Sequence, residues 1–392
     1  MSADLTEIYD SLFAYCESNN FAGWDPFDGL ESRIFQATPL RHVAATRLAW
    51  LQMVKRSPVN LRPALRVPKG VNAKGLALFA RAEFFRYRVT THISHKQNAQ
   101  NLLAMLREIA IEGISNSGER TMAFGYNFDW QSRAFFSPKG TPTIVPTAFA
   151  AQAFIESYKL FGDEADLEAD REICRFILND LNRPHSTDDE ICFSYTPGDN
   201  SLIYNASLLA GETLAAVGKI TKDQELIDMA AKSARYVVRN QREDGAWLYG
   251  PRLRHAWVDN FHTAFVLASL KKIAEVAPEP ATEETIKKGF DFWIDNFFLA
   301  DGTPKYFDNA VYPVDIHSAA AAIAALAAFK EMDDRALPLA EKVANWTIDS
   351  LRDPGGYFYY QKRRSMTVKI PFIRWGQAWM TFALSRLIEA KS

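Results

Sequence analysis

The sequence has few cysteines, no long uninterrupted apolar run and no leader-like N-terminus. Cys16, Cys174 and Cys192 are far apart and odd in number, so a reducing compartment is a simpler interpretation than a disulfide framework. No stretch reaches the roughly 18 consecutive apolar residues that would indicate a transmembrane helix. The start, "MSADLTEIYDSLFAYCESN", has early acidic residues and lacks the basic and apolar regions of a signal peptide. These absences predict a cytoplasmic protein.

An excess of charge of one sign is also missing. The 45 Lys and Arg residues nearly balance the 47 Asp and Glu residues, and the net charge of −2 argues against nucleic acid as a partner. Two segments are locally basic, residues 55–74 with six Lys or Arg and residues 362–374 with five. They either contact an anionic glycan, a lipid-linked diphosphate or a membrane surface, or form a solvated rim. No Cys/His cluster or HExxH motif is present, so we expect neither a metal nor another cofactor.

The most informative feature that is present is an internal repeat. Five segments begin with a polar residue followed by alanine and an apolar run, at Thr147, Asn205, Thr263, Ser318 and Gln377. By subtraction the starts are 58, 58, 55 and 59 residues apart, a spacing typical of repeated supersecondary units. Each unit predicts an apolar helix, a short acidic or Pro-containing turn, an amphipathic helix and a long loop. The alanine-rich stretch 318–329 predicts a tightly packed helix.

The repeat predicts a single domain, residues 1–392, with the all-α (α/α)6 toroid fold. Three further helical segments, 38–56, 75–91 and 96–114, bring the number of helices to about a dozen. A helix that is apolar on all sides must be buried on all sides, so alternating helices fit an inner barrel wrapped by an outer one. The last helix, from Trp375 onward, then pairs with a helix over roughly residues 3–17 to close the ring. An open solenoid is the competing architecture.

In such a toroid every long loop leads from an outer helix into the next inner helix, so all the long loops lie at one end. Loops on a rigid scaffold often carry binding and chemistry, and the inner-helix N-termini favour anionic groups. Aromatic faces beside carboxylates and amides suit a carbohydrate, and the alternative is that the aromatics only fill a wide barrel mouth. The candidate substrate-binding residues are Trp24, Asp25, Asp28, Tyr126, Trp130, Arg133, Tyr195, Tyr204, Asn205, Trp247, Trp257, Tyr306, Asp308, Tyr312, Arg374 and Trp375.

Two related segments offer residues for acid/base chemistry. "WVDNFHT" contains Asp259 and His262, and "YPVDIHS" places Asp315 and His317 one unit later. A zinc site is the least favoured interpretation, because no second ligand cluster accompanies these residues. Asp259 either caps the following helix or acts on substrate together with His262, and we weigh the two interpretations equally. The first inner turn is polar in several units, which a purely structural core would not need, since buried polar groups cost free energy unless paired.

The segment "YNFDWQSR" supplies a third catalytic candidate, Asp129. Asp129 either pairs with Arg133 or acts as a general acid or nucleophile. A glycosidase needs a second carboxylate, ~5–5.5 Å away for retention or ~6.5–9.5 Å away for inversion. The possible partners are Asp25, Asp28, Asp259, Asp308 and Asp315.

A uronate lyase or C5-epimerase would need other groups. It requires a base, for which His262, His317 and Tyr312 are candidates, and a cation such as Arg133 to neutralise the sugar carboxylate.

Two resemblances add to these observations. "QREDGAW" (241–247) resembles the Q-x3-G-x-W motif of terpenoid cyclases, which are α/α toroids, although no DxDD motif is present. The set "GWDPFDGL", "GYNFDWQSR", "PKGTP", "WVDNFHT", "DGTPKYFDN", "YPVDIHSAA" and "RWGQAW" is similar to a poorly characterised bacterial family that accompanies capsule or O-antigen biosynthesis and is assigned to six-hairpin carbohydrate enzymes. This second resemblance implies a sugar-related role.

The function predicted from the sequence is therefore cleavage of a glycosidic bond by carboxylates, in an acidic or lipid-linked glycan. The alternatives are a uronate lyase or C5-epimerase, a non-catalytic glycan-binding or assembly protein, and a terpenoid cyclase-like enzyme. The sugar, the linkage and the oligomeric state stay open.

Overall fold

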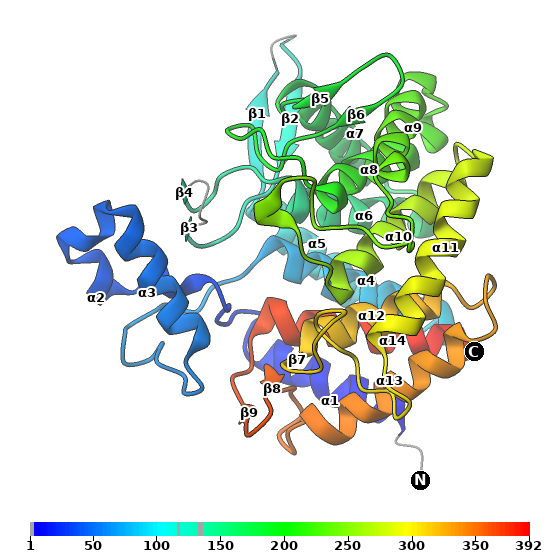
Figure 1. Cartoon of the computed structure of the whole chain (residues 1–392). Helices are drawn as coiled ribbons and strands as arrows, with labels where there is room; N and C mark the ends of the chain where they lie inside the picture. The colour runs from blue at the N-terminus through cyan, green and yellow to red at the C-terminus, as the bar shows by residue number, and fades with distance from the viewer. Residues whose placement is uncertain (1–3, 116–117, 132–135) are drawn as a thin grey trace.

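Six helices form a closed inner ring in the computed structural model, which describes residues 4–115, 118–131 and 136–392. Each inner helix packs against the next one along the chain, and the last packs against the first (Figure 1). This closure confirms the predicted toroid and excludes an open solenoid. The inner helices are α4 (Ala73–Thr90), α6 (Ile144–Phe161), α8 (Tyr204–Thr221), α10 (Asn260–Ala274), α12 (Ile316–Ala328) and α14 (Trp379–Lys391).

Six further helices form the outer ring. Each packs against the inner helix that precedes it, except that the N-terminal helix α1 packs against the C-terminal helix α14. The first and last helices therefore complete the sixth hairpin, as the repeat predicted. The outer helices are α1 (Leu5–Ser18), α5 (Ile93–Glu108), α7 (Glu164–Asn179), α9 (Gln224–Arg239), α11 (Pro280–Phe297) and α13 (Ala336–Leu351).

The pattern of apolar residues explains why the two rings separate. Inner helices such as α6 and α12 are buried on nearly every side, whereas outer helices such as α9 bury one face and expose the other. Residues in the short turns between an inner helix and the outer helix that follows it cap the helix ends. Asp163 and Asp223 accept backbone N–H groups at the starts of α7 and α9, and Gly162 ends α6 with φ +71°.

The connections from outer to inner helices are long and contain short antiparallel pairs. The strands are β1 (Ile111–Ile114) with β2 (Arg120–Ala123), β3 (Trp130–Gln131) with β4 (Phe136–Ser137), β5 (His185–Ser186) with β6 (Ile191–Cys192), and β7 (Val314–Asp315), β8 (Gln361–Lys362) and β9 (Thr367–Val368) in one three-stranded sheet. The helix predicted over 96–114 was too long. It ends at Glu108, because residues 111–114 pair with β2 instead of continuing the helix.

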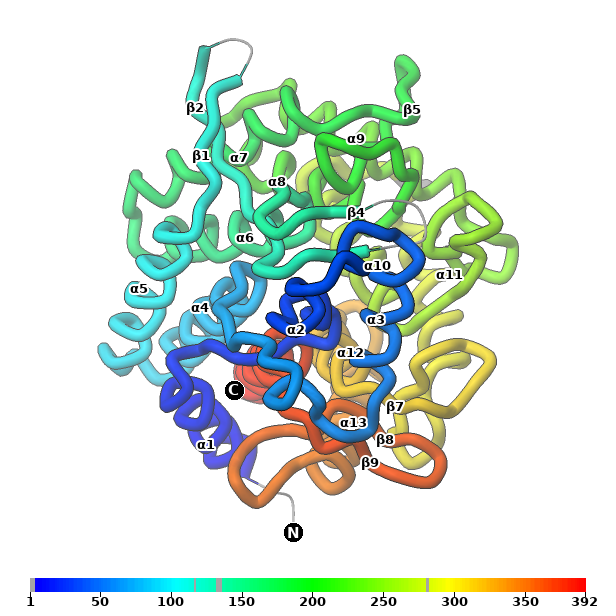
Figure 2. Tube along the Cα trace, turned by 90° about the vertical axis from the view of Figure 1, so that its left-hand side faces the viewer, coloured from blue at the N-terminus to red at the C-terminus, as the bar shows by residue number. Residues whose placement is uncertain are grey.

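The connection between α1 and α4 is the longest, and we call its residues 24–70 the cap. The cap contains η1 (Asp28–Glu31), α2 (Arg33–Gln36), η2 (Pro39–His42) and α3 (Ala44–Arg56). It has its own small apolar cluster around Leu30, Phe35 and Leu51, separate from the main core. The cap projects from the body in Figure 1 and lies in front of the ring in Figure 2, over the barrel end where the inner helices begin. Residues 38–56 are thus largely helical as predicted, but they lie outside both rings.

Among the described residues, no helix combines the length and the apolar character that a membrane span requires. The three cysteines are buried and unpaired.

Candidate active site

The first turns of the inner helices bring polar side chains together at the barrel mouth. Lys74 lies in the first turn of α4, Asn205 in that of α8, His262 in that of α10 and His317 in that of α12. Arg374 lies in η4 (Ile373–Ala378), directly before α14. Lys74, Arg374 and His262 all act electrostatically on His317, so the ring does gather these groups into one place.

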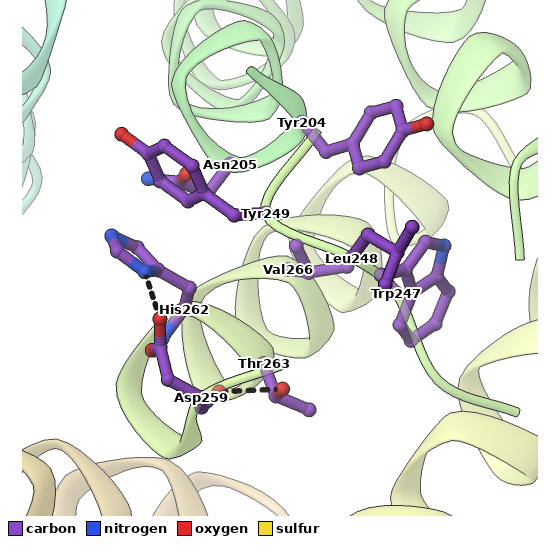
Figure 3. Close-up of a pocket in the computed structure, with 9 residues that line it drawn as sticks. All are labelled: Tyr204, Asn205, Trp247, Leu248, Tyr249, Asp259, His262, Thr263 and Val266. Carbon is purple, nitrogen blue, oxygen red and sulfur yellow. Dashed lines mark hydrogen bonds and ion pairs between the residues drawn. The ribbon is translucent and has the colours of Figure 1, made fainter. Parts of the chain in front are cut away.

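His262 and Asp259 form an oriented pair. Asp259 is the N-cap of α10, and its Oδ1 accepts the backbone N–H of His262 at 3.0 Å. Its Oδ2 accepts the imidazole Nδ1–H of His262 at 2.7 Å and the indole N–H of Trp257 at 2.9 Å (Figure 3). A proton held on Nδ1 leaves Nε2 of His262 as an acceptor, which is the state that a general base requires. The Asp259 carboxylate is buried, whereas the His262 side chain is 22% exposed.

A small pocket adjoins this pair. Tyr249 and Asn205 lie on the same side as His262, whereas Tyr204 and Trp247 point away from it (Figure 3). The Tyr249 and His262 rings are 4.5 Å apart, and Oδ1 of Asn205 is buried without a hydrogen-bond partner among the described residues. The pocket has a volume of about 10 Å³, which holds about one water molecule. The described residues therefore leave little open space beside His262.

His317 is a second imidazole at the mouth and is fully buried. Its Nδ1–H donates to the Trp375 carbonyl oxygen at 3.2 Å, and its Nε2 has no partner among the described residues. Burial, reinforced by the nearby cations Lys74 and Arg374, holds the pKa of His317 well below its usual value, so the ring is neutral. The Phe261 ring contacts both imidazoles, at 4.1 Å from His262 and 4.7 Å from His317.

Asp315 has the position on α12 that Asp259 has on α10. It caps the helix by accepting the His317 backbone N–H at 2.9 Å, and it accepts the Trp375 indole N–H at 2.8 Å. Burial raises the pKa of Asp315 to about 6. The carboxylates of Asp259 and Asp315 are thus both engaged by caps and indoles, which leaves the imidazoles as the groups with free atoms.

A buried ion pair holds the cap to the rim, and a second one braces the cap internally. Arg374 donates from Nε and Nη2 to the carboxylate of Asp25, at 2.6 and 2.9 Å. Within the cap, Arg62 donates to Asp28 at 2.6 Å and to the Asp25 carbonyl oxygen at 2.7 Å. All four side chains are buried, and the Asp25–Arg374 pair connects the cap to the barrel.

Two lysines that the sequence assigned only to a basic segment also reach the mouth. Lys55, on α3 of the cap, places Nζ 3.9 Å from the Phe27 ring, and burial lowers its pKa to about 8 against the opposing pull of Asp315. Lys74 is buried with Nζ 4.3 Å from the Phe149 ring, and burial holds its pKa well below the usual range. The apolar residues of α4 recur as in the other inner helices, and this pattern could have indicated that Lys74 lies in the first turn of an inner helix.

Half-buried and buried aromatic side chains lie near these polar residues. The hydroxyls of Tyr126 and Tyr195 are 3.1 Å apart, and the Trp130 ring lies 6.3 Å from the Tyr195 ring. Trp257 stacks on Tyr249 with ring centroids 4.7 Å apart. On the other side, Tyr306 and Trp375 both pack against Phe261, with ring centroids 5.7 and 5.8 Å from it.

Three other aromatic candidates are held by contacts within the protein, although Trp247 and Tyr204 also line the small pocket. The Trp24 indole donates to the Val67 carbonyl oxygen at the base of the cap, and the buried Trp247 indole donates to the Val237 carbonyl oxygen. Tyr204 is buried against Tyr236.

Two candidates lie on the loop before α12, and one is not described. Asp308 is partly buried there, and Tyr312 is 43% exposed. Arg133 lies outside the described residues.

The Q-x3-G-x-W segment forms a structural turn. Nε2 of Gln241 donates to the carbonyl oxygens of Gly245 and Thr285, both at 2.9 Å. Gly245 has φ +94°, and a Cβ there would lie 2.6 Å from the Lys288 carbonyl oxygen. The motif therefore joins a loop to α11, which requires no cyclase chemistry.

Asp129 lies where the cap meets the mouth. Its backbone N–H donates to Oε1 of Glu31 at 2.8 Å, and its Oδ1 accepts the Lys139 backbone N–H at 2.8 Å. Burial raises the pKa of Glu31, with the charge of Asp129 adding to the effect. The sequence did not single out Glu31, because only the folded cap brings it to Asp129. Among the described residues, no three His, Cys, Asp or Glu side chains are placed to hold a metal ion.

No protein-family model matches the chain, and no curated protein matches it. Several solved structures have a similar fold. A cellobiose 2-epimerase from Bacillus thermoamylovorans has a TM-score of 0.63 and 12% identity, over 82% of this chain and 88% of that one. A GH76 α-mannanase from Bacteroides thetaiotaomicron has a TM-score of 0.60 and 12% identity, over 82% of this chain and 86% of that one. A polysaccharide lyase has a TM-score of 0.60 and 11% identity, over 100% of this chain and 98% of that one. The chain has the toroid fold of these three enzymes.

Proposed function

We propose that the protein is a carbohydrate-active enzyme that transfers a proton at a sugar carbon, with His262 as the general base. The observation that carries this proposal is the Asp259–His262 pair, which fixes the proton on Nδ1 and leaves Nε2 free beside the pocket. The sequence slightly favoured cleavage by two carboxylates. Proton transfer now has more support, because Asp25, Asp28, Asp259 and Asp315 are all committed to hydrogen bonds or ion pairs within the protein.

The surrounding charges suit this chemistry. Removing a proton from a carbon next to a carbonyl or carboxylate places negative charge on the neighbouring oxygen, which a cation stabilises. Lys55 supplies positive charge at the mouth, whereas Arg374 is already paired with Asp25 and burial lowers the pKa of Lys74. The Lys55 cation favours a substrate with a carboxylate or an open-chain carbonyl.

His317 is a second proton acceptor near the pair. Its neutral ring carries its proton on Nδ1, which the Trp375 carbonyl oxygen holds, so Nε2 can accept a proton but has none to give. Return of a proton from a solvent water molecule to the opposite face of the carbon would invert it, giving an epimerase. Loss of a leaving group from the adjacent carbon would instead give a lyase. The enzymes with a similar fold include both classes, an epimerase and a lyase.

Glycosidic hydrolysis remains a second candidate because of Glu31 and Asp129. Glu31 accepts the Asp129 backbone N–H, and burial raises the pKa of the Glu31 carboxyl, as a general acid requires. A hydrolase would use Glu31 as the acid and Asp129 as the base or nucleophile.

Solvent exchange separates the two candidates. The protein is incubated in D₂O with mannose, cellobiose and glucuronate-containing oligosaccharides, and the sugars are followed by NMR and mass spectrometry. We expect deuterium at the carbon next to the carbonyl or carboxylate from an epimerase, or an unsaturated product from a lyase, and in either case a loss of about 10²–10⁴-fold in His262→Gln. The control His92→Gln changes an exposed histidine at the start of α5 and should keep full activity.

The carboxylate variants complete this test. Glu31→Gln and Asp129→Asn should keep most of the exchange. New reducing ends without deuterium, abolished by Glu31→Gln but not by His262→Gln, would overturn proton transfer in favour of hydrolysis. Sugar binding without any product would indicate a non-catalytic glycan-binding protein.

A further inference from the structure

A second cavity lies inside the inner ring, toward the end opposite the cap, with a volume of about 280 Å³. Its polar wall comes from later turns of the inner helices. By subtraction these residues lie 8, 8, 8, 12 and 7 positions beyond the first residue of their helices, about 10–18 Å further along the barrel. They are Arg81 on α4, Gln152 on α6, Glu212 on α8, Lys272 on α10 and Arg386 on α14, and the wall also includes Ser269 and the Lys271–Glu275 ion pair.

A layer of aromatic rings separates this cavity from the mouth. Phe149, Phe265 and Trp379 line the cavity, and the same three rings contact Nζ of Lys74 at 4.3, 5.0 and 5.0 Å. Lys74 is not part of the cavity wall and interacts with His317 at the mouth. The cavity is therefore distinct from the candidate active site.

The alanine run of α12 makes room for the cavity. Ala321, Ala324, Ala325 and Ala328 all line it, whereas the neighbouring inner helices present Phe149, Leu209, Phe265 and Phe382. The sequence predicted a tightly packed helix, and along the cavity its alanines face an open space. Small side chains facing an open space forgo packing energy, which a bound ligand can restore.

One cation at the cavity is left without a partner. Arg81 is paired with Glu156 at 2.7 Å, and Lys272 is paired with Glu212. Arg386 makes no hydrogen bond or ion pair with any described residue, and its guanidinium lies 5.1 Å from the centre of the Phe85 ring. Burial lowers the pKa of Arg386 to about 10, so the group still carries its charge at neutral pH.

We propose that this cavity binds a small carboxylate-bearing molecule, with the carboxylate on Arg386 and a ring or apolar body against the alanine and aromatic wall. A guanidinium fork matches a carboxylate with two parallel hydrogen bonds. The volume is near the lower end of ordinary ligand pockets, which fits one ring and excludes an oligosaccharide. The site does not depend on the proposed proton-transfer chemistry.

Calorimetric titration tests the assignment with four probes. Benzoate and D-glucuronate carry a ring and a carboxylate, acetate carries only the carboxylate, and benzyl alcohol carries only the ring. We expect benzoate or glucuronate to bind at least tenfold more tightly than acetate and benzyl alcohol. Preference for benzoate would indicate an aromatic acid, and preference for glucuronate would indicate a sugar acid.

Two variants locate the binding. Arg386→Met removes the charge, and Ala324→Leu places a larger side chain in the cavity. Each should weaken binding at least tenfold while keeping wild-type helicity by circular dichroism. Arg235→Met and Ala45→Leu, which change a surface ion pair and an exposed position on α3, should bind as the wild type does. The proposal is overturned if no ring-bearing carboxylate binds the wild type, or if binding persists unchanged in both cavity variants.

Discussion

The Asp315→Asn substitution should change how the stability of the protein depends on pH. Burial raises the pKa of Asp315 from 3.8 to about 6 in the folded protein. The folded state therefore holds the proton more tightly than the unfolded state does. The contribution of this group to stability is then fully present below about pH 3.8, decreases as the pH rises to about 6, and is constant above that. The asparagine side chain of the variant cannot ionise and avoids this loss.

The size of the effect follows from the shift. The pKa of Asp315 is raised by about 2 units, and each unit corresponds to about 1.36 kcal/mol. The contribution of Asp315 to the unfolding free energy therefore differs by about 3 kcal/mol between the acidic and the alkaline limits. About 2 kcal/mol of that difference falls between pH 4.5 and pH 8. The unfolding free energy of Asp315→Asn, minus that of the wild type, should therefore become more positive by about 2 kcal/mol over this range.

Urea unfolding followed by circular dichroism at pH 4.5, 5.5, 6.5 and 8 measures this difference. Other carboxylates titrate in both proteins and cancel in the subtraction. Asp188→Asn, at an exposed turn, is the matched control and should show a difference that does not vary with pH. A flat profile for Asp315→Asn, or one that falls with rising pH, would refute the assignment of a desolvated carboxylate to the α12 cap.

Two further predictions concern the cap and the turn before α10. Arg374→Met leaves the Asp25 carboxylate buried without its partner and should cost about 3–5 kcal/mol, whereas adding Asp25→Asn should recover part of that loss. Additive losses in urea unfolding would show that the ion pair is not formed. Gly245→Ala should cost about 1–3 kcal/mol, since φ is +94° and a Cβ would lie 2.6 Å from the Lys288 carbonyl oxygen. Gly162→Ala, with positive φ but no atom within 4 Å of the Cβ, should cost less in thermal melts.

The architecture was predictable because the repeat is a direct consequence of burial. A helix surrounded by others needs apolar residues on every side, and that need recurs at each inner helix, from Thr147 to Gln377. The cap was not predictable in the same way. The residues of α3 have helical periodicity like those of a ring helix, and only contacts distant in sequence, such as Asp25 with Arg374, place the segment over the mouth.

The candidate site was predictable in part for a related reason. Repeat alignment located His262, His317 and Asn205 in first inner turns, where the structure has them. The direction of loop side chains cannot be read from a sequence. Trp24 and Trp247 were therefore grouped with the binding residues although both indoles bond to backbone carbonyls.

The polar residues of the first inner turns fall into two groups once their partners are known. Thr147 accepts the Phe124 N–H, and Gln377 exchanges two hydrogen bonds with Phe358, so these two attach loops to the ring. Asn205 and His317, in contrast, each keep a buried polar atom unpaired. An unpaired buried polar atom costs about 1–3 kcal/mol, and a fold gains nothing from it unless a ligand supplies the partner.

Asn205 lies on α8 and His317 on α12, on either side of the His262 pair on α10. The indole Nε1 of Trp379, at the start of α14, is a further buried atom without a partner among the described residues. The paired residues belong to α6 and to the turn before α14. A purely structural explanation of the polar first turns would predict satisfied partners for Asn205 and His317 as well. We therefore propose that the substrate lies over α8, α10 and α12, with Asn205, His262 and His317 as the groups that it would contact.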